Sequence, residues 1–373
     1  MKIRWMPAFG LGLIAVLFAS CTIGGEAPEV YRYFVYVTNA RTGNVSVYAM
    51  DKDAGDLKAA EGSPFTTGAE PRAVAVDPAG KFAYVANFAD DNISAFTIEK
   101  TTGELTPVPG SPFDAGTSPC SIAIDPAGKF LYAANARSGD VWLYAINADT
   151  GALTAAADPA LATGIAPRSV AVDPTGKYLY VAVEDAGRIA AAAINPDTGA
   201  LAAVPGSPFD AGGFPRSLAI DPAGKFVYAA KDTSNEVAAF TIDPATGALT
   251  EVSSSPYTAG TNPSGIAIDP DGKFAYVANE GSANVSAFNL DPATGRLTAV
   301  SGSPYDVDIG PSAAAVDPQG DFVFVTNFWS TNISAFSINS TGGALKEITG
   351  SPFDGEPDVG GNPSAIAVIR ITQ

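Results

Sequence analysis

Three arginines of this chain stand in equivalent places of a repeated pattern, each directly after a proline. They are Arg72, Arg168 and Arg216. A guanidinium group presents five N–H donors in a planar fork that suits a carboxylate or a phosphate. Because the chain has a formal charge of −18, three arginines brought together would form a cationic site for an anionic ligand in an otherwise acidic protein.

Further charged and aromatic side chains follow a second set of equivalent apolar segments. Carboxylates stand there at Glu184, Asp232 and Glu280, and any of them could activate water for attack on a carbonyl carbon. The other candidates for ligand binding are one lysine and three aromatic residues, Lys231, Phe88, Phe328 and Trp329. The pattern predicts a charged crescent facing an aromatic one, and it leaves the catalytic residue open among the three carboxylates.

Composition excludes several other kinds of chemistry. The chain has no histidine, so it lacks histidine metal ligands and Ser-His-Asp or Cys-His catalytic pairs. We expect neither a metal nor a cofactor. With 39 acidic and 21 basic residues and no basic run, we expect no nucleic-acid partner and no binding of the folded part to an anionic membrane.

An internal repeat determines which elements must position these residues. The tetrapeptide Asp-Pro-x-Gly recurs every 48 residues, beginning at Asp77, Asp125, Asp173, Asp221, Asp269 and Asp317. Each unit contains four short segments rich in Val, Ile, Phe and Tyr, bounded by Gly, Pro, Asn or Asp, which is typical of strands and tight turns. In the second unit the predicted strands are 120–124, 129–134, 141–146 and 153–157.

The two ends of the chain complement each other. The first unit lacks its first strand, and a lone strand of that type, 364–368, follows the last unit. Pairing these ends closes a ring and removes exposed sheet edges. We therefore predict an all-β fold, a seven-bladed β-propeller of four-stranded antiparallel blades, closed by the C-terminal strand joining the N-terminal blade. It would occupy residues 31–373 as a single domain.

Motifs shared by most units are assigned to the scaffold. They include Thr-Gly-x-Leu and Gly-Ser-Pro followed by Phe or Tyr. A further one is Asn-x-Ser at Asn44, Asn92, Asn284 and Asn332. The last motif matches a glycosylation pattern, but its recurrence at one place in the repeat favours a structural role. The sequence pattern thus confines candidate chemistry to positions that differ between blades.

The N-terminus has the features of an export signal. Lys2 and Arg4 precede an apolar stretch that is too short to span a bilayer. The sequence Leu-Phe-Ala-Ser before Cys21 resembles the bacterial lipobox, which implies lipid attachment at Cys21. We expect a signal peptide at 1–20, a flexible tether at 21–30, and a monomer held in the bacterial cell envelope, periplasmic or surface-exposed. An ordinary cleaved signal peptide is the alternative.

The repeat also resembles a known family. Residues 36–39 read YVTN, echoed by YVAN at 84–87 and 276–279 and by FVTN at 324–327. These motifs are similar to those of the YVTN-repeat and lactonase-type propellers, which include bacterial 6-phosphogluconolactonase. The resemblance implies a seven-bladed fold and, for some members, hydrolysis of a sugar lactone. Such relatives often place histidine directly after an arginine equivalent to Arg72, Arg168 and Arg216. This chain has Ala73, Ser169 and Ser217 at those places.

Two functional hypotheses therefore remain open. The first is an exported binding or scaffold protein for a small anionic ligand, a glycan or a protein partner. The alternative is a lactonase at the channel mouth. In a purely structural reading, Arg168 and Arg216 pair with Glu184 and Asp232 across adjacent blades and only neutralise the mouth. Fully bidentate pairing of every arginine would remove the basis of the lactonase alternative.

Overall fold

The computed structural model describes residues 31–354 and 361–372. The expected signal peptide, the tether and Cys21 lie outside these residues. The described residues form strands and turns. Among them there is no helix that is both long enough and apolar enough to cross a bilayer.

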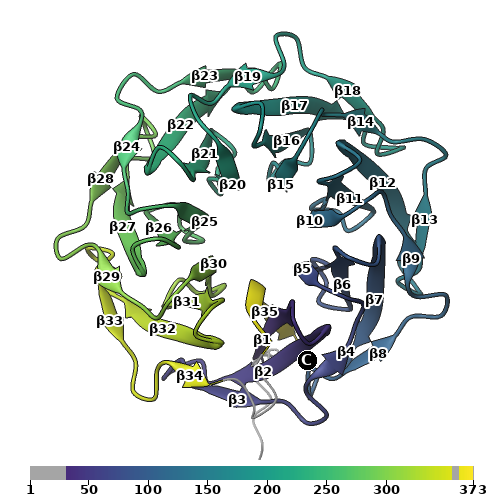
Figure 1. Cartoon of the computed structure of the whole chain (residues 1–373), viewed down its shortest axis with the longest axis horizontal. Helices are drawn as coiled ribbons and strands as arrows, with labels where there is room; N and C mark the ends of the chain where they lie inside the picture. The colour runs from purple at the N-terminus through teal and green to yellow at the C-terminus, as the bar shows by residue number, and fades with distance from the viewer. Residues whose placement is uncertain (1–30, 355–360, 373) are drawn as a thin grey trace, which may run out of the picture.

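Seven antiparallel sheets stand around a central axis like the blades of a propeller (Figure 1). The strand next to the axis in each blade begins at a proline. These inner strands are β5 (Pro71–Val76), β10 (Pro119–Ile124), β15 (Pro167–Val172), β20 (Pro215–Ile220), β25 (Pro263–Ile268), β30 (Pro311–Val316) and β35 (Pro363–Thr372). The second strands are β1 (Tyr31–Asn39), β6 (Phe82–Asn87), β11 (Phe130–Asn135), β16 (Tyr178–Val183), β21 (Phe226–Lys231), β26 (Phe274–Asn279) and β31 (Phe322–Asn327).

The outer half of each blade begins with a third strand of seven residues. The third strands are β2 (Asn44–Met50), β7 (Asn92–Ile98), β12 (Asp140–Ile146), β17 (Arg188–Ile194), β22 (Glu236–Ile242), β27 (Asn284–Leu290) and β32 (Asn332–Ile338). The next strands are β3 (Leu57–Ala59), β8 (Leu105–Pro107), β13 (Leu153–Ala155), β18 (Leu201–Ala203), β23 (Leu249–Glu251), β28 (Leu297–Ala299) and β33 (Leu345–Glu347).

The predicted fourth strand is divided into two pieces. A two-residue strand follows a tight turn, which is Gly-Ser-Pro in five of the blades, and pairs with the same third strand as the first piece. These short strands are β4 (Phe65–Thr66), β9 (Phe113–Asp114), β14 (Leu161–Ala162), β19 (Phe209–Asp210), β24 (Tyr257–Thr258), β29 (Tyr305–Asp306) and β34 (Phe353–Asp354). In the first blade the turn is held because the backbone N–H of Val47 donates to Ser63 Oγ at 2.9 Å. The blade is therefore four strands wide, with a broken outer edge.

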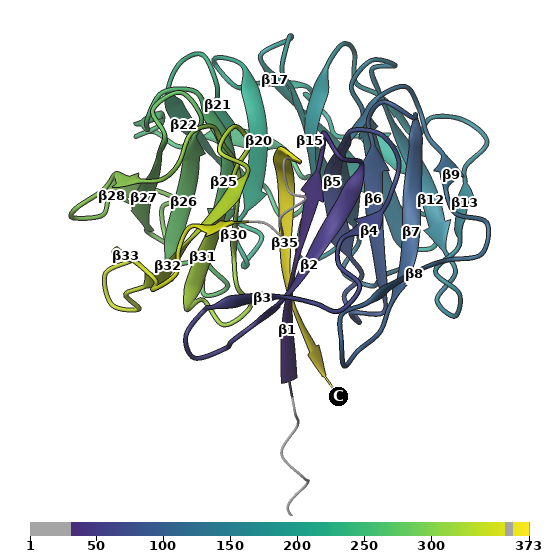
Figure 2. The same ribbon diagram turned by 60° about the horizontal axis from the view of Figure 1, so that its bottom comes forward.

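The ring closes as the sequence predicts. Strand β35 pairs antiparallel with β1 from Tyr31 opposite Thr372 to Thr38 opposite Ala365 (Figure 2). The C-terminal strand is longer than the predicted segment 364–368, because it follows β1 to its start. The first blade therefore combines the four N-terminal strands β1 to β4 with β35, an inner strand from the last residues of the chain.

The core lies between the blades, where the second strands are fully buried. Their tyrosines also link adjacent blades: Tyr84 Oη donates to the carbonyl oxygen of Gly151 at 3.0 Å, and the spacing of 67 residues recurs at six seams. Phe324, also fully buried, holds the equivalent place at the seventh seam. At the Asn-x-Ser motif, Asn92 Oδ1 accepts a hydrogen bond from Asn87 Nδ2 at 2.7 Å, which supports a structural role for the motif.

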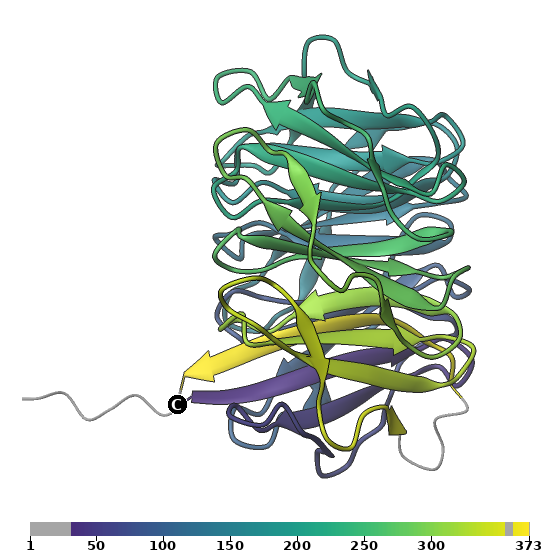
Figure 3. The same cartoon turned by 90° about the vertical axis from the view of Figure 1, so that its left-hand side faces the viewer.

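Strand direction determines which residues meet at each face. Because adjacent strands are antiparallel, the start of an inner strand lies beside the end of a second strand, as Pro71 lies opposite Asn87. We call this face the mouth face. Strand β1 ends there at Asn39, so it begins at the opposite face, where β35 also ends (Figure 3).

Candidate functional site

A cavity of about 360 Å³ opens at the mouth face, around the first residues of the inner strands. All seven inner strands contribute to its lining, so it lies on the ring axis. Its volume is in the range of small-ligand sites. Of the residues selected from the sequence, five line it: Arg72, Arg168, Arg216, Glu280 and Phe328.

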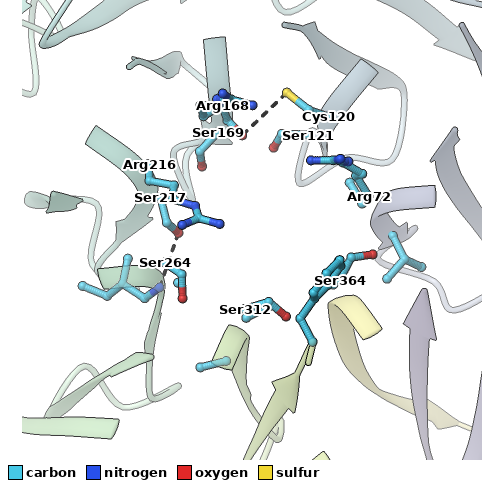
Figure 4. A pocket seen from close by; sticks show the side chains of 18 of the residues that line it. Arg72, Cys120, Ser121, Arg168, Ser169, Arg216, Ser217, Ser264, Ser312 and Ser364 are labelled. Atoms are coloured by element: carbon cyan, nitrogen blue, oxygen red, sulfur yellow. Dashed lines mark hydrogen bonds between the residues drawn. The ribbon is translucent and has the colours of Figure 1, made fainter. Parts of the chain in front are cut away.

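The residue after the proline builds the ring at four of the seven blades. Ser264 Oγ donates to the carbonyl oxygen of Pro311 at 2.6 Å, joining its inner strand to the next blade. Equivalent bonds are donated by Cys120, Ser312 and Ser364. At the other three blades this position is arginine. Figure 4 shows the three arginines on one side of the ring and Ser264, Ser312 and Ser364 on the other.

The serine one residue further along also joins the seam at two of the three arginine blades, and Ser121 does the same at the Cys120 blade. The backbone N–H of Leu218 donates to Ser169 Oγ at 3.1 Å, and that of Ile266 donates to Ser217 Oγ at 3.3 Å. The sequence identified these positions but not their role, because nothing in the pattern shows that the next blade offers an unpaired N–H there.

Arg168 is held by a carboxylate of its own blade. Its Nε donates to Glu184 Oε2 at 2.6 Å. Burial lowers the pKa of Arg168, but the hydrogen bond and charge of Glu184 outweigh that effect, so the pKa lies above its usual value. Glu184 is not part of the cavity lining, which makes it a positioning residue for Arg168. The predicted pairing is thus present, although it runs within a blade and not across two.

Arg216 is held by a carboxylate of the next blade. Its Nη1 donates to Glu280 Oε2 at 2.6 Å, and both residues line the cavity. The predicted partner, Asp232, instead accepts a hydrogen bond from Asn262 Nδ2 at 2.9 Å and is not among the lining residues. The prediction of an Arg216–Asp232 pair is wrong because the side chain of Arg216 reaches across the seam.

Arg72 has the loosest contacts of the three arginines. Its Nη2 lies 3.3 Å from Glu70 Oε2, and its Cζ lies 4.2 Å from the centroid of the Phe88 ring. Stacking on an aromatic face orients a guanidinium without using its N–H donors. Phe88 therefore orients Arg72 by stacking on its guanidinium group and is not part of the cavity lining.

Two other predicted ligand-binding residues lie away from the cavity. Lys231 is buried within its blade, where Nζ contacts the carbonyl oxygen of Gly212 at 3.1 Å and Glu236 Oε2 at 2.9 Å. Trp329 lies outside the cavity and is 63% exposed. It contacts Phe328 edge-on, with ring centroids 4.9 Å apart. The predicted crescents thus reduce to three arginines, one glutamate and one phenylalanine.

Cys120 lines the cavity without the features of a nucleophile. Its Sγ donates to the carbonyl oxygen of Pro167 at 3.0 Å. Burial raises the pKa of the thiol to about 12, against the opposing effect of the arginine charges. A thiol is a poor nucleophile compared with its thiolate, so Cys120 serves the ring as the serines do.

Comparison with known proteins places the chain in a family. A family model described as "Lactonase, 7-bladed beta-propeller" matches residues 31–117, 107–209, 210–260 and 253–358. The chain belongs to the lactonase family of seven-bladed propellers. No curated protein matches the chain significantly.

Solved structures of similar fold superpose on nearly the whole of this chain. A proposed 6-phosphogluconolactonase from Bacteroides uniformis superposes with a TM-score of 0.78 and 21% identity, covering 91% of this chain and 99% of that one. One from Bacteroides fragilis has a TM-score of 0.75 and 24% identity, covering 91% and 98%. The periplasmic gluconolactonase of Pseudomonas aeruginosa has a TM-score of 0.75 and 21% identity, covering 91% and 99%. At these identities the likeness concerns the fold.

Proposed function

We propose that this protein hydrolyses a sugar lactone in the cavity of the mouth face. The observation that carries the proposal is the meeting of three arginines and a carboxylate in one cavity of a lactonase-family propeller. The same site would suit anion binding without turnover. The family match and the placement of Glu280 beside the arginines favour the lactonase over a binding or scaffold protein.

Each arginine retains donors for a ligand. The contacts of Arg168 and Arg216 with their glutamates each use one nitrogen, and a guanidinium has five N–H donors. The pairing is thus not bidentate at either residue. The free donors would bind the lactone carbonyl and, where present, a phosphate or carboxylate of the substrate. Positive charge held in place before the reaction stabilises an oxyanion more than water does.

Glu280 is the candidate general base, because it is the carboxylate of the predicted set that lines the cavity. It would take a proton from water while the water oxygen bonds to the lactone carbonyl carbon. The resulting oxyanion would be stabilised by Arg168 and Arg216. Collapse then breaks the ring C–O bond, and the proton held by Glu280 passes to the departing alkoxide, which gives the hydroxy acid.

The cellular location bears on the choice of lactone. We expect export from the N-terminal sequence, and one structural relative is named a periplasmic gluconolactonase. An exported enzyme would meet unphosphorylated lactones outside the cytoplasm. Glucono-1,5-lactone is therefore the first substrate to test, with 6-phosphogluconolactone as the second.

Initial rates of acid release test the proposal. The purified protein should open at least one of the two lactones faster than its spontaneous hydrolysis. Replacing an oxyanion-binding group lowers kcat by about a hundredfold or more, so Arg216→Ala should reduce kcat/KM to that extent. Arg296→Ala, at an exposed turn away from the mouth face, is the matched control. An unchanged rate in Arg216→Ala would contradict the proposal.

A further inference from the structure

The exposed large hydrophobic residues of the described chain are concentrated on the mouth face. There are four, all in loops that precede inner strands or follow second strands: Ile165, Phe214, Ile309 and Trp329. A large exposed apolar side chain needs an explanation when it adjoins a ligand cavity. Trp329 is the largest of them, and its neighbour Phe328 lines the cavity.

The indole of Trp329 occupies space provided by a glycine. Gly310 has a φ of +75°, and a Cβ added to it would lie 2.2 Å from Trp329 Cδ1. The equivalent residues of the other blades all carry side chains: Glu70, Ser118, Ala166, Phe214, Asn262 and Asn362. All of these except Phe214 also have a positive φ. The backbone therefore does not require glycine here. Both positions differ from blade to blade, and in this blade Gly310 and Trp329 fit each other.

Other contacts hold the indole beside the cavity. Its ring meets that of Phe328 at 85° with a centroid distance of 4.9 Å, a favourable edge-to-face arrangement. The backbone N–H of Trp329 donates to the carbonyl oxygen of Ile309 at 3.2 Å. An aromatic wall thus continues from the cavity lining to the surface, and its outer part stays open to solvent.

Polar groups border this aromatic wall. Asp308 accepts a hydrogen bond from Asn332 Nδ2 at 2.5 Å, and Ser330 Oγ accepts one from the backbone N–H of Ile309 at 2.9 Å. A sugar ring has an apolar C–H face and a rim of hydroxyls, so it matches an aromatic surface with polar neighbours. A protein partner needs roughly 800 Å² on each side, and the four exposed residues come from the loops of three different blades.

We propose that Trp329, seated on Gly310 and braced by Phe328, is a stacking subsite for a second sugar ring of the ligand. The inference rests on the proposed function and narrows it: the preferred substrate is the lactone of a disaccharide acid, with its lactone ring in the cavity and its glycosyl ring on the indole. A monosaccharide lactone would use the cavity alone.

Binding of stable product anions tests the subsite separately from catalysis. Cellobionate and gluconate share the carboxylate that the arginines would bind, and only cellobionate has a second ring. Loss of one aromatic stacking partner reduces affinity by about tenfold, so Trp329→Ala should weaken cellobionate binding by about that factor in calorimetric titration. It should change gluconate binding by less than about twofold.

Two further variants separate stacking from general effects. Gly310→Ala should also weaken cellobionate binding selectively, because the new Cβ displaces the indole while Ala166 shows that the backbone accepts alanine at this place. Ile165→Ala, an exposed mouth-face residue of another blade, should leave both affinities unchanged. Circular dichroism would establish that each variant is folded.

Several results would overturn the subsite. One is wild-type protein that binds cellobionate no more tightly than gluconate. Another is a Trp329→Ala variant that loses both ligands equally. A third is a change from dimer to monomer in that variant without a selective effect on cellobionate, which would assign the indole to self-association. None of these depends on turnover, so the lactonase proposal stands or falls on its own hydrolysis assay.

Discussion

A single position of the repeat shows how scaffold and site differ in this protein. After the proline of each inner strand, a small hydrogen-bond donor joins two blades at Cys120, Ser264, Ser312 and Ser364. Arginine at the other three blades reaches into the cavity instead. The positions that differ between blades are therefore the ones to test for chemistry, and those of Gly310 and Trp329 are a second example.

The chemistry of Cys120 gives a prediction at the residue scale. With a pKa raised to about 12, the thiol is almost wholly protonated at pH 8. Since an unperturbed cysteine has a pKa of about 8.5, Cys120 should react with iodoacetamide at least about a thousandfold more slowly than in the unfolded chain. Peptide mass spectrometry of timed labelling measures this. Equal rates in the folded and unfolded chain would be inconsistent with a protected thiol.

Strands and turns could be predicted from the sequence to within one or two residues in most places. The second strand predicted at 129–134, for example, is Phe130–Asn135. The divided outer strand could not be predicted, because a two-residue strand such as Phe65–Thr66 is too short to show a period. Its position depends on hydrogen bonds from the third strand, which local sequence does not encode.

The tyrosine links between blades give a prediction at the element scale. Tyr276 Oη donates to the carbonyl oxygen of Gly343 at 3.1 Å. At the seventh seam Phe324 takes the place of the tyrosine, and Gly55 is the glycine equivalent to Gly343. Phe324→Tyr should complete the set and raise the free energy of unfolding by about 1 kcal/mol, whereas Tyr276→Phe should lower it by about 1 kcal/mol. Chemical denaturation measures both. If Phe324→Tyr destabilises the protein, the seventh seam lacks room for the hydroxyl.

The ring as a whole could be predicted because its strands could be counted. The complementary ends of the chain predicted the pairing of β1 with β35, which the register confirms. Side-chain partners across the mouth could not be predicted in the same way. Arg216 contacts Glu280 and not Asp232 because the result depends on side-chain reach across a seam between residues far apart in sequence.

Buried tyrosines make the whole molecule sensitive to alkaline pH. Burial raises the pKa of Tyr36, Tyr84, Tyr132, Tyr144, Tyr180, Tyr228 and Tyr276. In the unfolded chain the tyrosine hydroxyls ionise at about pH 10. Above that pH the unfolded state releases protons that the folded state keeps, so stability present below about pH 10 is lost as the pH rises.

The denaturation midpoint should therefore begin to fall between pH 8 and pH 9.5, where Cys120 ionises in the unfolded chain, and should fall more steeply above about pH 10. Guanidinium titrations at fixed ionic strength measure it, with tyrosinate absorbance at each pH as the parallel signal. Tyrosine ionisation near pH 10 without unfolding would show that the hydroxyls are accessible in the folded ring.

The central claim is that the cavity hydrolyses a lactone with Glu280 as general base, and the rate of acid release from glucono-1,5-lactone and 6-phosphogluconolactone tests it most directly. Glu280→Gln should lower kcat/KM by about a hundredfold or more. Glu251→Gln, on outer strand β23 where its Oε1 accepts from Ser255 Oγ at 2.8 Å, should keep the wild-type value. Wild-type protein that opens neither lactone faster than water does, or a Glu280→Gln variant as fast as wild type, would contradict the claim.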